Sequence, residues 1–109
     1  LGLVLMLKNE YEIVSNGFAG KGRYDLLLKP KNILKGKEGI IIESKALNMA
    51  KKLDKDKIKA KLENECEIAL NQIDEKEYVS VLKNAGVERI LKIGIAFFGK
   101  EFEVKFEKE

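Results

Sequence analysis

The strongest fold signal in this 109-residue chain is the sequence Gly-Ile-Ile-Ile-Glu-Ser-Lys-Ala-Leu at residues 39–47. Its three consecutive isoleucines indicate a strand that is covered on both faces, and therefore a central strand of a sheet. Side chains alternate along a strand, so Glu43 and Lys45 are predicted to point to the same face, about 7 Å apart at about 3.3 Å per residue. This buried strand therefore carries two charged side chains on one face.

A second acid, Asp25, lies in the run Gly-Arg-Tyr-Asp-Leu-Leu-Leu-Lys-Pro, which also has the pattern of a buried strand. An ionised carboxylate among aliphatic side chains is costly unless a cation or a full set of hydrogen bonds compensates it. Two carboxylates and one ammonium on adjacent strands can hold a divalent metal ion and a water molecule beside it. The alternative is an ion-pair cluster of Asp25, Glu43 and Lys45 that stabilises the fold without chemistry.

The rest of the pattern predicts an α/β sandwich with a mixed sheet. Glycine-bearing turns separate short alternating runs, whereas apolar residues at spacings of three and four indicate helices. The two-sided central strand needs helices above and below it. In chain order we expect the end of a core helix, strands over about 10–16, 22–29 and 40–45, helices over about 56–76 and 77–84, and strands over 90–99 and 101–107.

The last predicted strand, residues 101–107, alternates strictly between apolar and charged residues. Phe102, Val104 and Phe106 are expected to form the one apolar face of an edge strand. Glu103 and Lys105 are then expected to lie on its solvent side.

Length and composition suit one compact domain over residues 1–109. The chain begins with leucine, and its first seven residues read as the end of a core helix, so we interpret it as a fragment of a longer protein. That run is too short to span a bilayer and lacks the flanks of a signal peptide. The single cysteine, Cys66, excludes an intramolecular disulfide and favours a cytoplasmic location.

The absence of histidine excludes histidine zinc sites and Ser-His or Cys-His nucleophile pairs within this chain. The net charge of +3 does not by itself indicate nucleic-acid binding. The lysines of residues 51–61 are either phosphate contacts or a solvated helix face.

Asp25, the triplet Glu43-Ser44-Lys45 after three isoleucines, and the helix and strand that follow resemble the PD-(D/E)XK nuclease superfamily. More narrowly, several separated segments resemble the nuclease-like C-terminal domain of bacterial and archaeal AAA-ATPase-like proteins, in which an ATPase-like region normally lies upstream. These segments are residues 15–16, 20–25, 40–45, 72–73 with Tyr78, and 90–97. The chain departs from the family at Gly17-Phe18, where an Arg-Glu pair is usual, and at Tyr24, where the superfamily's name has proline.

The resemblance implies a restriction-endonuclease-like sandwich, with an αβββαβ core, an incomplete N-terminal helix and an added C-terminal hairpin strand. It also implies that Asp25 and Glu43 coordinate Mg²⁺ or Mn²⁺, with the Ser44 carbonyl as a further ligand. Lys45 would orient or polarise the attacking water. Gln72 would act near the metal, although a hydrogen bond from the helix edge to backbone explains it equally well.

Two more residues are candidates. Some nucleases of the superfamily place a tyrosine four residues after the helical glutamine, whereas Tyr78 follows Gln72 by six and would leave that face of a continuous helix. Arg23 shares a strand face with Asp25, and would form an ion pair with it or contact a phosphate.

The implied function is metal-dependent hydrolysis of phosphodiester bonds in DNA, or in RNA, by a domain attached to an ATPase-like protein. One alternative is a catalytically silent nuclease-fold module for protein interaction or regulation of that ATPase. Another is nucleic-acid binding without cleavage through residues 51–61. We expect nucleic acid, not a membrane, as the partner.

Overall fold

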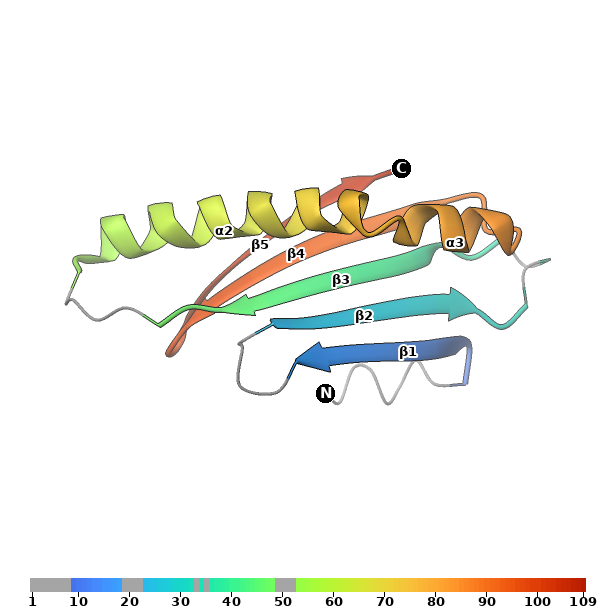
Figure 1. The fold of residues 1–109 in the computed structure, drawn as a ribbon, viewed down its shortest axis with the longest axis horizontal. Coiled ribbons are helices and arrows are strands. Elements are labelled where there is room, and N and C mark those ends of the chain that lie inside the picture. The colour runs from blue at the N-terminus through green and yellow to red at the C-terminus, as the bar shows by residue number, and fades with distance from the viewer. Residues whose placement is uncertain (1–8, 19–22, 33, 35, 49–52) are drawn as a thin grey trace.

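The computed structural model describes residues 9–18, 23–32, 34, 36–48 and 53–109. Within this part, one five-stranded sheet carries two helices (Figure 1). In chain order the elements are β1 (Tyr11–Phe18), β2 (Arg23–Pro30), β3 (Gly39–Ala46), α2 (Lys55–Glu75), α3 (Tyr78–Asn84), β4 (Ile90–Phe98) and β5 (Glu101–Lys108). Each predicted strand and helix is confirmed to within about two residues, and the expected N-terminal helix end falls in residues 1–8, outside the described part.

The sheet is mixed, as predicted, and its strands lie side by side in chain order. β3 and β4 are parallel, while the other neighbouring strands are antiparallel. A parallel pair needs a crossover connection, which α2 and α3 supply. The chain therefore has an α/β fold with the parallel pair at the centre of the sheet.

Both helices cover the same face of this sheet. Their apolar stripes meet alternate residues of β3 and β4, which produces two buried clusters. The clusters consist of Ile41, Leu70, Ile73, Leu82, Val87 and Ile90, and of Leu62, Cys66 and Ala96. The other face of the central strands, which includes Ile40 and Ile42, is half-buried, and no described helix covers it.

Gly94 of β4 allows α2 to approach the sheet closely. A Cβ atom at this position would lie only 2.6 Å from the carbonyl oxygen of Cys66 in the helix. Gly94 is also the β4 neighbour of Glu43. This close approach of helix and sheet is therefore beside the acid of the central strand.

The prediction for β5 was wrong about which face is solvated. Phe102 and Phe106 are 61% and 67% exposed, and Val104 is also exposed. Lys105 instead forms a 2.8 Å ion pair with Glu67 of α2. Alternation separates two faces, but pairing with β4 decides which one meets the helix, and this register places the apolar side chains on the face away from α2.

Candidate active site

The two predicted metal ligands lie directly opposite each other. Asp25 of β2 pairs with Glu43 of β3 in the antiparallel register. Both lie on the sheet face that the helices cover, and they are 4% and 0% exposed. Two carboxylates buried side by side require a positive charge close by.

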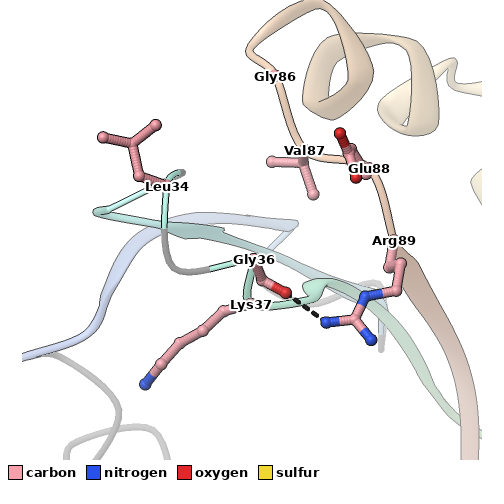
Figure 2. A pocket seen from close by; sticks show the side chains of 7 residues that line it. All are labelled: Leu34, Gly36, Lys37, Gly86, Val87, Glu88 and Arg89. Carbon is pink, nitrogen blue, oxygen red and sulfur yellow. Dashed lines mark hydrogen bonds between the residues drawn. The ribbon is translucent and has the colours of Figure 1, made fainter.

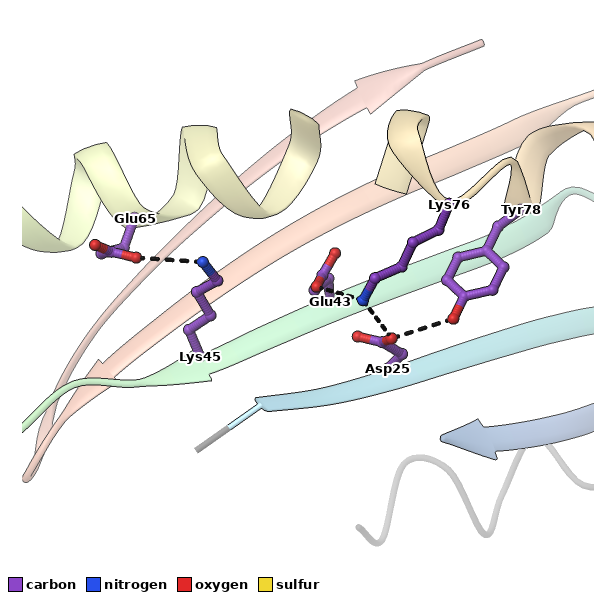
Figure 3. Close-up of polar contacts among 6 residues, drawn as sticks. All are labelled: Asp25, Glu43, Lys45, Glu65, Lys76 and Tyr78. Atoms are coloured by element: carbon purple, nitrogen blue, oxygen red, sulfur yellow. Dashed lines mark hydrogen bonds and ion pairs between the residues drawn. The ribbon is translucent and has the colours of Figure 1, made fainter. Parts of the chain in front are cut away.

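That charge comes from Lys76, a residue that the sequence analysis did not select. Its Nζ lies 2.8 Å from Asp25 Oδ2 and 2.9 Å from Glu43 Oε1. Tyr78 donates a 3.1 Å hydrogen bond from its hydroxyl to the same Asp25 oxygen. Figure 3 shows both side chains descending from the end of α2 and the start of α3 onto the acid pair.

A break between the two helices brings Lys76 and Tyr78 to this position. Lys76 caps the C-terminus of α2, and Glu77 then adopts a left-handed conformation with φ 59° and ψ 25°. This conformation is costly for a residue with a Cβ atom, by roughly 1–2 kcal/mol. It turns the chain between Lys76 and Tyr78, so that both side chains reach Asp25.

Lys76 is protonated at neutral pH. Burial lowers its pKa, but the hydrogen bonds to Asp25 and Glu43 outweigh burial and raise the pKa above the ordinary lysine value. The second oxygen of Asp25, Oδ1, is buried and accepts no hydrogen bond from the described residues. One ammonium thus serves two carboxylates and leaves an Asp25 oxygen open to a further ligand.

Lys45 forms an ion pair with helix α2. It lies two residues after Glu43 on β3, and its Nζ is 3.6 Å from Glu65 Oε2 of α2. Figure 3 shows the Lys45–Glu65 pair beside the acid pair, farther along the same sheet face. The structure therefore brings Lys45 near the carboxylates and joins it to an acid that the sequence analysis did not select.

Gln72 is half-buried on α2. It follows Glu65 by seven residues and precedes Lys76 by four, so the three lie on one side of the helix. The Ser44 side chain alternates to the opposite face from Glu43, so only its backbone remains a candidate ligand. The side chain of Arg23 lies outside the described part.

The donor atoms of the acid pair fit a hard divalent cation. Carboxylate oxygens suit Mg²⁺, which keeps several water molecules and needs only one or two carboxylates from a protein. No group of three or more potential ligands among His, Cys, Asp and Glu gathers within the described residues. The fit therefore rests on two carboxylates and on the open oxygen of Asp25.

A cavity in the described part lies away from the acid pair. It encloses about 380 Å³ near the start of β3 and the end of α3, and Lys37 and Arg89 are among its lining residues (Figure 2). Lys37 pairs with Glu10, and Arg89 donates a hydrogen bond to the carbonyl of Gly36. Both cationic side chains have partners within the protein, so the acid pair is the better candidate for the functional site.

The lysines at the start of α2 bear on the two alternatives for residues 51–61. Lys55, Lys57, Lys59 and Lys61 are all exposed. This exposure agrees both with a solvated helix face and with contacts to phosphate. The preceding residues 49–52 lie outside the described part.

The chain belongs to the PD-(D/E)XK nuclease superfamily, because the sequence model of that superfamily matches residues 1–107. The mixed sheet with its helices is consistent with the restriction-endonuclease-like fold of these proteins. Members are generally nucleases and usually use divalent metal ions, so membership supports a nuclease-like hydrolase that acts on nucleic acid. No curated protein and no solved structure matches the chain. Among the described residues, no helix is both long and apolar enough to cross a membrane.

Proposed function

We propose that this chain is a metal-dependent nuclease domain that hydrolyses phosphodiester bonds in DNA, with RNA as the other substrate class. The observation that carries the proposal is the buried pair of Asp25 and Glu43, which face each other across β2 and β3. Because hydrogen bonds leave Asp25 Oδ1 open, the pair retains an oxygen ligand for a cation.

In this proposal Asp25 and Glu43 hold Mg²⁺ or Mn²⁺, with the Ser44 carbonyl as a third ligand. When bound, the ion supplies Lewis-acid activation of a water molecule and neutralises charge on the phosphate. Lys45, on the same strand face, orients that water and offsets charge that develops on the phosphate. Glu65 holds Lys45 through the 3.6 Å ion pair.

Gln72 is proposed to hydrogen-bond near the reacting groups, since it lies between Glu65 and Lys76 on the inner side of α2. A Gln72→Ala variant is expected to lower kcat while the fold is retained. A variant with lower thermal stability but a normal kcat would show that Gln72 is a structural residue.

The broader setting is also part of the proposal. The segments that resemble AAA-ATPase-associated nuclease domains support a single nuclease domain over residues 1–109, joined to an upstream ATPase-like region in a longer cytoplasmic protein. Expression of that longer protein, followed by cleavage assays with and without ATP, tests the attachment.

Cleavage of DNA and RNA oligonucleotides in Mg²⁺ or Mn²⁺ tests the activity. The wild-type protein is expected to cleave at least one of them, whereas Asp25→Asn, Glu43→Gln and Lys45→Gln are expected to lose most of the activity. Lys83→Gln, a change to an exposed lysine of α3, is the matched control for charge. Activity that survives Asp25→Asn would refute the proposed site.

A second candidate function has its own supporting observation. Lys76 already compensates both acids in part, as a purely structural ion-pair cluster would require. The domain would then be a silent nuclease-fold module that regulates or recruits partners. This candidate predicts a folded protein whose thermal stability does not respond to Mn²⁺.

A further inference from the structure

The Lys76 ammonium contacts the same two side chains that are proposed to bind the metal ion. It bridges Asp25 and Glu43 at 2.8 and 2.9 Å. It comes from the end of α2, whereas Lys45, the lysine of the family triplet, comes from β3 and pairs with Glu65. The acid pair thus carries a resident cation of its own.

This cation compensates the pair only in part. Two buried carboxylates share one ammonium, and Asp25 Oδ1 still lacks a hydrogen bond from the described residues. The pair therefore continues to attract positive charge. A divalent ion bound to either oxygen of Asp25 would lie within a few ångströms of Nζ, and the two cations would repel each other beside these buried carboxylates.

Lys76 has room to move away. Its side chain is 29% exposed, whereas those of Asp25 and Glu43 are 5% and 0% exposed. A long, partly exposed lysine can turn its ammonium into solvent, but the two acids remain fixed by their strands.

We propose that Lys76 is a built-in counter-cation: it holds the acid pair together in the metal-free protein and lowers the affinity of the pair for a divalent metal ion. This inference rests on the proposed function, because it takes the acid pair to be the metal site. It assigns the lysine at the α2–α3 break a role distinct from that of Lys45. The metal and the ammonium stabilise the same carboxylates, and each weakens the binding of the other.

Calorimetric titration of Mn²⁺ tests the inference directly. Lys76→Gln removes the charge and keeps a polar side chain of similar length, so it should bind Mn²⁺ about tenfold more tightly than wild type, or more. Lys76→Arg keeps the charge and should stay within about threefold of wild type. Lys83→Gln, which removes an exposed charge from α3, should leave the affinity unchanged and so excludes a general charge effect.

Thermal unfolding with and without Mn²⁺ is the second readout. Lys76→Gln should unfold at a lower temperature than wild type without metal, and Mn²⁺ should raise its midpoint by more than it raises that of wild type. A variant that folds only when Mn²⁺ is added would also agree with the inference.

Two results would overturn the inference and leave the proposed function intact. One is a folded Lys76→Gln variant that binds Mn²⁺ no more tightly than a metal-binding wild type. The other is an unfolded variant that Mn²⁺ cannot refold, since the metal would then not replace the ammonium. If neither wild type nor Lys76→Gln binds Mn²⁺, the metal site of the proposed function itself is wrong.

Discussion

Replacing Gly94 with alanine is expected to separate α2 from the sheet and destabilise the protein substantially. The new Cβ would lie 2.6 Å from the Cys66 carbonyl oxygen, whereas an ordinary contact is at least 3.4 Å, so backbone must shift by about 0.8 Å. The same Cβ would lie 3.2 Å from Cβ of Ala69 and 3.3 Å from Cγ of Leu70. The helix cannot relieve these contacts by rotating one side chain, because the nearest atom belongs to its backbone.

The expected cost is about 2–3 kcal/mol, near the top of the usual range for overpacking. Alanine also restricts the unfolded chain, which offsets roughly 0.4–1 kcal/mol. For a domain of this size the net loss lowers the thermal midpoint by roughly 10 °C. Urea denaturation followed by circular dichroism measures the free energy of unfolding.

Gly99→Ala is the matched control, because no atom lies within 4 Å of its new Cβ and only its φ of +58° opposes alanine. It should cost about 1 kcal/mol. Since Gly94 neighbours Glu43, Gly94→Ala should also weaken Mn²⁺ binding, while Gly99→Ala should not. A Gly94→Ala protein as stable as wild type would refute the close approach of α2 to β4.

Three further predictions concern the remaining polar features. Lys92 is 3% exposed and pairs with Asp74 at 2.9 Å. Lys92→Met should lower the free energy of unfolding by only about 1–2 kcal/mol, because the acidic partners of Lys92 are half-exposed and solvent screens them. Burial lowers the Lys92 pKa, but hydrogen bonds to its acids outweigh burial and raise the pKa above the ordinary 10.5. This stabilisation is therefore present below about pH 10.5 and is lost at higher pH. Urea denaturation from pH 8 to 12 should show a smaller alkaline loss of stability for Lys92→Met than for wild type. Cys66 is fully buried and burial raises the pKa of its thiol, so iodoacetamide should modify the native protein at least about 100-fold more slowly than the urea-unfolded protein; comparable rates would contradict its burial. Asp54 accepts a 2.9 Å hydrogen bond from the backbone N–H of Lys57 at the start of α2, so Asp54→Ala should lose about 1 kcal/mol in chemical denaturation and Asp54→Asn nearly nothing.

Local patterns were sufficient to predict the elements and the acid pair. Three isoleucines before Glu43 mark the central strand, and spacings of three and four mark α2. The pairing of Asp25 with Glu43 follows from two adjacent strands joined by one connection. These features depend on residues close in sequence or on one antiparallel register.

The cation between the acids could not be predicted in the same way. Lys76 lies at the end of α2, and Tyr78 reaches Asp25 only because Glu77 is left-handed. A glutamate does not signal that conformation in the sequence, as a glycine would. In a continuous helix Tyr78 would leave the face that carries Gln72, which is what the spacing predicted. That prediction was wrong because the chain turns at Glu77 and brings Tyr78 to Asp25. Glu65 was detectable, since it precedes Gln72 by two helical turns and faces the strand of Lys45.

The orientation of β5 was the other feature beyond local patterns. Alternation at Phe102, Val104 and Phe106 defines a face, but the register with β4 selects the side of the sheet. Long-range pairing therefore decided a feature that composition left open.

Mn²⁺ titration of the wild-type protein and of Asp25→Asn, by calorimetry, separates a metal site from a purely structural acid pair. We predict saturable binding by wild type and loss of that binding in Asp25→Asn, with both proteins folded. Absence of binding by the folded wild-type protein, or equal binding by the variant, would contradict a metal site at Asp25 and Glu43.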